Sequence, residues 1–309
     1  MITALCGGVG GSKLAVGLYR TLPPDELSIV VNTADDLEFY GLHISPDLDT
    51  VTYTLAGLAR TDVGWGLEGD SFAVLSMLGT YGAPTWFQIG DRDLATDIYR
   101  TDGLRTGKTL TSVTREIASS LGVHASIFPM TDARVATRLL VHGEWLEFQD
   151  YFVRRRHADP VEAIRYDGIG EAPATSQVLE AIESAEVIVV VNSNPALSIM
   201  PILSTPGVND TLVATSARRI AVSPIVGSDA VTGPAGRLMR LLGYEASATG
   251  VAEAYLGVID GILIHTTDAA QKDAIEGLGV AVQCADTIMR TEADRERLAA
   301  EAISFARSL

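Results

Sequence analysis

The stretch that decides the fold is "ITALCGGVGGSKLAVGLYRTLPPDELSIVV", residues 2–31. Ile2–Cys6 is a short apolar run, the glycines of 7–11 interrupt it, and Lys13–Leu22 has helical spacing. Pro23-Pro24 ends that helix, and Leu27–Val31 is a second run rich in β-branched residues. Strand, glycine loop, helix and strand in this order predict the start of a parallel α/β sheet.

The rest of the chain extends this pattern, with an interruption. Helical spacing marks 51–58, 71–81, 94–99 and 110–121, and alternation predicts a hairpin over 135–141 and 145–152. Apolar strands return at 187–191, 220–222, 261–264 and 280–282, and 292–308 is a closing helix. We expect one α/β domain over 1–309: a Rossmann-like, mainly parallel sheet with a large, mostly helical insertion at about 60–175 that carries the hairpin.

Composition excludes several classes of protein. Among 309 residues, 47% are hydrophobic, enough for a large core. The net charge of −16 argues against nucleic-acid binding, which needs a basic surface. Two cysteines suggest no disulfide framework, and we expect neither signal peptide nor membrane segment. The expectation is a cytoplasmic protein with small-molecule partners, and a homodimer follows only from base rates.

The glycine loop is a candidate phosphate site. Its four glycines let backbone amides approach a phosphate, and the positive end of the following helix faces the same point. The loop matches neither the P-loop nor GxGxxG, and a tight turn with glycines only for packing remains open. Lys13 either reaches a phosphate or lies on the helix surface. The residues concerned are Gly7, Gly8, Gly10, Gly11 and Lys13.

Acidic residues follow the second strand. Asn32, Asp35 and Asp36 come at its carboxyl end, which faces the ligand crevice of a parallel sheet. Asp47 and Asp49 then open a predicted helix. Helix capping explains one or two of these acids. Oxygen ligands of this kind also bind Mg²⁺, and the residues alone leave the two interpretations open.

Three further loops carry polar residues. In "GDRDLATD", 90–97, Arg92 is either a phosphate or ring contact, or part of a solvated helix start. Two later strands end in polar turns, the second before a helix expected from Gly233; ordinary connections are the alternative for each. The turns are Ser193-Asn194-Pro195 and Ser223-Pro224.

Several of these motifs occur together in one order. "GGVGGSKL", "VVNTADDLEFYGLHISPDLDT", "GDRDLATDIYRT", "NSNPALSI" and "VSPIVG…GPAG" resemble the 2-phospho-L-lactate transferase family of coenzyme F-420 biosynthesis, over essentially the whole chain. The resemblance implies transfer of a phospho-three-carbon-acid group, 2-phospho-L-lactate or a close analogue, from a guanosine diphosphate-linked donor. The acceptor would be the ribityl hydroxyl of 7,8-didemethyl-8-hydroxy-5-deazariboflavin, with release of GMP and assistance by Mg²⁺. The insertion at about 60–175 would then form part of the acceptor site.

The resemblance also implies residue roles. Asp49 would contact the deazaflavin and act catalytically, beside Asp47. Asp35 and then Asp36 would bind Mg²⁺. The position two before Gly90 is often basic in the family and contacts the deazaflavin; here it is Gln88, with Arg92 as the residue that compensates. Donor nucleotide and phosphate would meet Gly7, Gly8, Gly10, Gly11, Lys13, Asn32, Ser193, Asn194, Pro195, Ser223 and Pro224.

Two rival functions use the same features. A non-catalytic, nucleotide-sugar-binding regulator of related fold shares the glycine loop and the acid pair, but needs no acceptor site. The interpretation as an NAD-dependent oxidoreductase has less support, because the glycine spacing differs from that of dinucleotide-binding loops and no residue stands out as a hydride-transfer partner.

Overall fold

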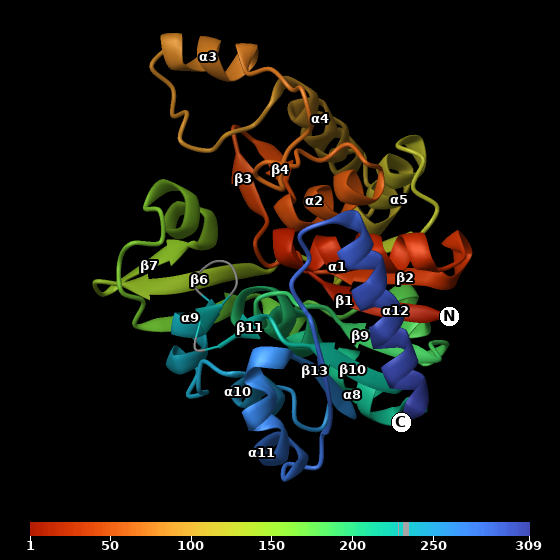
Figure 1. Ribbon diagram of the computed structural model, residues 1–309. Helices are drawn as coiled ribbons and strands as arrows, with labels where there is room; N and C mark the ends of the chain where they lie inside the picture. Colours follow the sequence, from red (N-terminus) through yellow and green to blue (C-terminus); the bar gives the residue numbers. More distant parts are fainter. Residues whose placement is uncertain (228, 231–234) are drawn as a thin grey trace.

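A seven-stranded sheet, parallel throughout, forms the centre of the molecule in a computed structural model that describes residues 1–227, 229–230 and 235–309 (Figure 1). Its order is β14-β13-β10-β9-β1-β2-β5. Every adjacent pair is parallel. The strands are β1 (Ile2–Cys6), β2 (Leu27–Val31), β5 (Ser126–Pro129), β9 (Val187–Val190), β10 (Arg218–Val222), β13 (Gly261–His265) and β14 (Ala281–Ala285). The expected α/β class with a Rossmann-like parallel sheet is confirmed.

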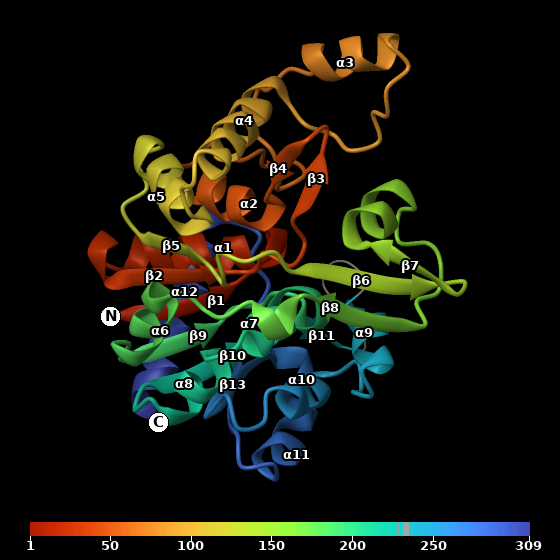
Figure 2. The same cartoon turned by 180° about the vertical axis from the view of Figure 1, so that it is seen from behind.

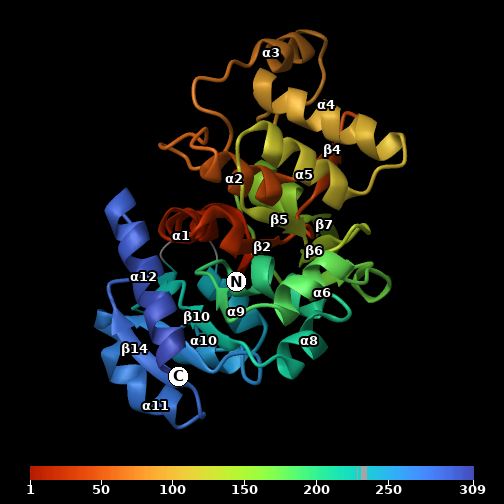
Figure 3. The ribbon, with the colours of Figure 1, turned by 90° about the vertical axis from the view of Figure 1, so that its right-hand side faces the viewer.

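Helices cover both faces of this sheet, and each face has its own apolar core (Figures 2 and 3). One core joins the sheet to α1 (Gly8–Thr21), α2 (Pro46–Leu55), α5 (Leu110–Ser120) and α12 (Glu292–Ser308). The other joins it to α6 (Ser176–Glu183), α7 (Met200–Ser204), α8 (Val208–Ala214), α9 (Ala235–Leu241), α10 (Ala248–Ala254) and α11 (Lys272–Glu276). Strands buried on both faces explain the continuous apolar runs in the sequence.

Smaller elements stand on the carboxyl side of the sheet. A hairpin, β3 (Leu37–Phe39) and β4 (Leu42–Ile44), leads to α2. α3 (Ala73–Thr80) lies far from the sheet and α4 (Asp91–Arg105) connects it back to the body (Figure 1). A three-stranded antiparallel sheet consists of β6 (Ala136–Val141), β7 (Glu144–Glu147) and β8 (Ala163–Asp167). Two short strands, β11 (Ile225–Val226) and β12 (Asp229–Ala230), pair with each other.

Short helical turns complete the connections. They are η1 (Pro24–Glu26), η2 (Asp150–Arg154), η3 (Ile169–Glu171), η4 (Pro195–Ile199) and η5 (Thr266–Gln271). Among the described residues, no helix has both the length and the apolar character needed to cross a membrane.

The sequence pattern and the structure differ in a few places. β5 falls inside the expected insertion of 60–175 but is an edge strand of the main sheet; at four residues it is too short to stand out by pattern. The expected second hairpin strand over 145–152 ends at Glu147, and a helical turn replaces its second half. The hairpin β3–β4 and strand β8 carried no recognised signal. Gly233, the expected helix start, lies outside the described residues.

The order of strands creates a crevice. The chain runs from β1 outward through β2 to β5, then returns to β9 on the other side of β1. Loops after β1 and β9 therefore leave the sheet in opposite directions, which opens space at the carboxyl edge where α/β proteins bind ligands.

Candidate functional site

A cavity of about 510 Å³ lies at this carboxyl edge. The loops that follow β1, β2, β9, β10 and β14 contribute to it, together with α2 and residues from the η2 region. It collects most of the candidate site residues: Gly7, Gly8, Gly10, Lys13, Asp35, Asp47, Asp49, Gln88, Ser193, Asn194, Ser223 and Pro224. The remaining candidates do not line the cavity: Gly11, Asn32, Asp36, Arg92 and Pro195.

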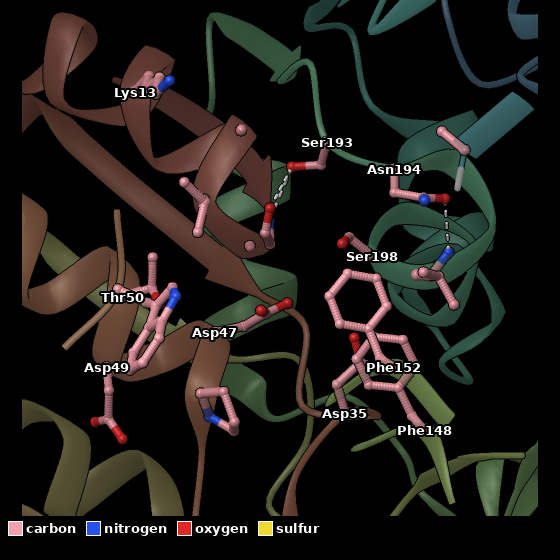
Figure 4. Close-up of a pocket in the computed structure, with 18 of the residues that line it drawn as sticks. Lys13, Asp35, Asp47, Asp49, Thr50, Phe148, Phe152, Ser193, Asn194 and Ser198 are labelled. Atoms are coloured by element: carbon pink, nitrogen blue, oxygen red, sulfur yellow. Dashed lines mark hydrogen bonds between the residues drawn. The ribbon is translucent and has the colours of Figure 1, made fainter. Parts of the chain in front are cut away.

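The glycine loop is held against the loop after β9. Gly7 N–H donates to Ser193 Oγ (3.1 Å), and that hydroxyl donates to Gly7 O (2.7 Å; Figure 4). A Cβ on Gly7 would lie 2.6 Å from Asp47 Oδ2, and one on Gly11 would collide with Ser193 Oγ. Gly8 has φ +63°, which favours glycine. Close approach requires glycine at positions 7 and 11, and the left-handed backbone favours it at position 8. Gly8 and Gly10, in the first turn of α1, line the cavity.

The two strand-end turns are shaped by their own hydrogen bonds. Asn194 Oδ1 accepts from Ala196 N (3.0 Å) and Leu197 N (3.2 Å), so it caps η4 and leaves its amide nitrogen for other partners. Ser223 Oγ donates to Ile225 O (3.1 Å) and lines the cavity beside Pro224. Pro195 is buried within the turn.

The acids after β2 separate into two environments. Asp35 lines the cavity, and its Oδ1 is buried without a hydrogen-bond partner among the described residues. Asp36 Oδ2 accepts from Ser45 Oγ (2.7 Å) and contacts His43 Nε2 (2.9 Å). The side chain of Asp36 is therefore engaged with the β4 region and does not line the cavity.

Asp47 joins Asp35 in the cavity. Its Oδ2 accepts from Asn32 Nδ2 (3.0 Å), so the fully buried Asn32 acts on the site through Asp47. Burial raises the pKa of Asp47 to about 6, against the opposing hydrogen bond from Asn32. Burial, and then the charge of Asp47, raise the pKa of Asp35 well above its usual range. Among the described residues, no basic side chain lies close enough to oppose either shift.

This pair fits a bound Mg²⁺. An unpartnered buried carboxylate oxygen beside a second carboxylate is what a hard cation needs. Among the described residues, no group of three or more His, Cys, Asp or Glu side chains forms a metal cage. A cation here would therefore need oxygens from water and substrate phosphates as well, which is usual for Mg²⁺.

A second acidic group lies farther along α2. Asp49 lines the cavity and is paired with Arg100 of α4, whose guanidinium also bonds Asp97 Oδ1 (2.8 Å). Tyr53 Oη donates to Asp93 Oδ1 (2.8 Å), and both of these side chains line the cavity. Burial raises the pKa of Asp49, that of Asp93 to about 7 and that of Asp97 to about 9, while Arg100 opposes each shift.

The "GDRD" segment folds into reciprocal helix caps. Asp91 accepts from Ser71 Oγ (2.6 Å) and from the first amides of α3. Asp70 accepts from the amides of Arg92 (2.9 Å) and Asp93 (3.1 Å), at the start of α4. The exposed Arg92 side chain donates to Glu68 O (3.0 Å), so Asp93, not Arg92, reaches the cavity from this segment.

Aromatic and C-terminal residues in the lining had no recognised signal in the sequence. Phe148 and Phe152 stack with ring centroids 5.1 Å apart and 28° between planes, facing Asp35 and Ser198 (Figure 4). Their spacing of four residues is a helical period, whereas the alternation over 145–152 predicts a strand. Trp65, Phe87 and Tyr53 contribute further rings, and the segment after β14 contributes Thr287, Ile288 and Met289.

The fold and the cavity define a Rossmann-like α/β protein in which the glycine loop and two carboxylate groups line one cavity. The family described as "2-phospho-L-lactate transferase CofD" matches residues 2–305. A 2-phospho-L-lactate transferase of Methanospirillum hungatei is 40% identical over 98% of this chain and 99% of its own. A phosphoenolpyruvate transferase of Streptomyces coelicolor is 37% identical over 99% and 98%.

The chain belongs to the CofD family of 2-phospho-L-lactate transferases and is a transferase of coenzyme F-420 biosynthesis. The resemblance seen in the motifs is confirmed, and the non-catalytic regulator and the oxidoreductase are set aside. A solved structure of a upf0052 family member from Bacillus halodurans has a TM-score of 0.66 over 98% of both chains. At 16% identity, that likeness shows the shared fold alone.

Proposed function

We propose that the enzyme moves a phospho-three-carbon-acid group, 2-phospho-L-lactate or a close analogue, from a guanosine diphosphate-linked donor to the terminal ribityl hydroxyl of 7,8-didemethyl-8-hydroxy-5-deazariboflavin, with GMP as the leaving group. One observation carries the proposal: the glycine loop, both carboxylate groups and an aromatic wall share a single cavity. Its volume of about 510 Å³ lies within the range of small-molecule sites.

The donor would occupy the half built by the loops after β1, β9 and β10. The first amides of α1 would face the diphosphate, because a helix N-terminus favours an anion. Ser193, Asn194, Ser223 and Pro224 would line the guanosine part. The relatives support a phosphorylated three-carbon acid as the transferred group without deciding which one, since one relative is named for 2-phospho-L-lactate and another for phosphoenolpyruvate.

The deazaflavin would occupy the half beside α2. Trp65, Phe87 and Tyr53 offer apolar rings there, and Gln88 and Asp49 offer polar contacts. Offset stacking of aromatic rings adds to the area they bury. Gln88 supplies an amide where the family often has a basic residue, and the position of Arg92 makes it an unsuitable substitute.

In the proposed reaction the ribityl oxygen attacks the phosphorus that carries the three-carbon acid, and the bond from that phosphorus to the bridging oxygen of GMP breaks. Asp49 accepts the proton of the hydroxyl, since a carboxylate within hydrogen-bond reach serves as a general base. Asp35 and Asp47 would hold Mg²⁺, with Asp36 outside the lining. When bound, Mg²⁺ neutralises charge on the phosphates.

The test supplies one acid at a time. Purified enzyme is given the deazaflavin, Mg²⁺ and the guanylylated form of phospholactate, phosphoenolpyruvate or 3-phosphoglycerate. We expect GMP release and a deazaflavin product whose mass identifies the acid that is transferred. GMP release that does not depend on the deazaflavin, or no product with any of the three, would refute the proposal.

A further inference from the structure

Helix α4 buries two ionisable side chains and exposes apolar ones. Asp97 and Arg100 are 0% and 1% exposed, whereas Ile98 and Tyr99 between them are 51% and 50% exposed. A soluble helix normally does the reverse. Burial of the Arg100 charge is costly unless partners compensate it, so the partners of Arg100 carry the explanation.

The guanidinium of Arg100 connects three elements. Its Nη2 donates to Asp49 Oδ1 on α2, and its Nη1 donates to Asp97 Oδ1 (2.8 Å) on α4 itself. The same Nη1 donates to His43 O (3.3 Å) at β4. Of these side chains, Asp49 alone lines the cavity. Arg100 contacts Asp49 from the protein interior, and Asp97 contacts Arg100 in turn.

The contact with Arg100 restricts the orientation of the Asp49 carboxylate. A short carboxylate on a helix has few rotamers, and the contact of Oδ1 with a fully buried cation selects among them. The guanidinium of Arg100 is itself fixed in position, because its other terminal nitrogen donates to Asp97 Oδ1 and to the His43 carbonyl.

We propose that Arg100, fixed by Asp97, is a positioning residue that aims the Asp49 carboxylate at the acceptor hydroxyl. The inference rests on the proposed function. A buried ion pair is weak evidence for stability, because well-packed apolar residues often stabilise a core as well or better. Positioning of a reacting group gives a better reason for the buried pair, since a displacement of about 1 Å can lower a rate on the order of 100-fold.

A double-mutant cycle tests the proposal. Arg100→Gln, Asp49→Asn and the double variant are compared with wild type in GMP release at saturating donor and acceptor. If Arg100 acts through Asp49, each single variant lowers kcat on the order of 100-fold, and the double variant falls no further than Asp49→Asn. The KM of the donor stays within a factor of about three, as uniform binding is untouched. Multiplied losses in the double variant would show that Arg100 acts independently and would overturn the proposal.

Controls separate positioning from folding. Arg105→Gln alters an exposed arginine of the same helix that donates to Gly41 O (3.1 Å), and should retain wild-type kcat. Arg100→Lys keeps the charge without the planar fork and should recover part of the lost rate. If Arg100→Gln does not fold, Asp97→Asn takes its place in the cycle with the same non-additive expectation. A wild-type enzyme without acceptor-dependent GMP release refutes the proposed function, whereas active wild type with an additive cycle refutes only this inference.

Discussion

Asn32 Nδ2 donates a hydrogen bond of 3.0 Å to Asp47 Oδ2, and this contact ties the end of β2 to the first turn of α2. Asn32 is wholly buried and Asp47 is at the cavity. The bond fixes one oxygen of Asp47 and lowers a pKa that burial raises, which keeps the carboxylate closer to its ionised form. Asp47 is thereby held at the cavity that Asp35 also lines, where we propose that the two carboxylates bind Mg²⁺.

The first prediction concerns that pair. Asp47→Asn removes one of two carboxylates, so the Mg²⁺ concentration for half-maximal GMP release should rise at least about tenfold. The same holds for Asp35→Asn. Asp36→Asn should shift it less, because Asp36 is held by Ser45 and His43 outside the lining. Titration of activity with Mg²⁺ measures this, and equal shifts in all three variants would contradict the assignment.

The second prediction assigns the general base. Asp49→Asn keeps the shape but cannot accept the proton, so kcat should fall about 10²-fold or more. Donor affinity, measured by titration calorimetry without acceptor, should change little. A variant that turns over like wild type would remove Asp49 from the mechanism.

The third prediction separates two candidate acceptor contacts. Gln88 lines the cavity, whereas the Arg92 side chain donates to Glu68 O instead. Gln88→Ala should weaken deazaflavin binding in a fluorescence titration, and Arg92→Ala should leave it within a factor of about two of wild type. The opposite order of effects would show that Arg92 reaches the acceptor.

The fourth prediction concerns the glycine loop. A Cβ at Gly11 would strike Ser193 Oγ and approach Val191 Cγ2 to 2.9 Å, so Gly11→Ala should destabilise the protein by about 1–3 kcal/mol. Because Ser193 holds both the N–H and the carbonyl of Gly7, donor binding should weaken too. Gly170→Ala, where a Cβ meets nothing within 4 Å, is the control in urea unfolding. Equal stabilities of the two variants would contradict the packing argument.

The fifth prediction is a pH dependence. Burial raises the pKa of Asp97 to about 9, so the folded protein holds a proton there that the unfolded chain loses near pH 4. Between these values the folded state binds more protons, and stability therefore falls as pH rises. Asp97→Asn cannot titrate and should make that fall shallower, by at most about 1.4 kcal/mol per pH unit.

Urea unfolding at a series of pH values from 5 to 9 checks this. Asp102→Asn, the same change at an exposed acid of the same helix, is the matched control variant. A slope unchanged by Asp97→Asn would mean that Asp97 is ionised in the folded protein across this range.

The sequence predicted the architecture where local signals were strong. The bounds of β1 and β2 follow from short apolar runs between glycines and prolines. The closing helix is predicted over 292–308, and the structure shows that α12 begins there with a capping box of Thr291 and Asp294. Prediction was weaker in the 60–175 region, where β5 has four residues and the rings of Phe148 and Phe152 lie on a helical turn after β7. Short elements like these are determined by the sheet they join more than by their own pattern.

By itself the sequence determined the parallel α/β class, the glycine loop at the first strand end and the family, because each rests on spacing within one segment or on the order of segments. Only the tertiary structure decided which side chains share the cavity. Asp35 and Asp47 line the cavity, whereas Asp36 does not. Asp93 lines it where Arg92 was expected, and Arg100 pairs with Asp49 from the protein interior. The physical reason is that neighbours in sequence point to different sides of a turn or helix, so their environment depends on packing between distant elements.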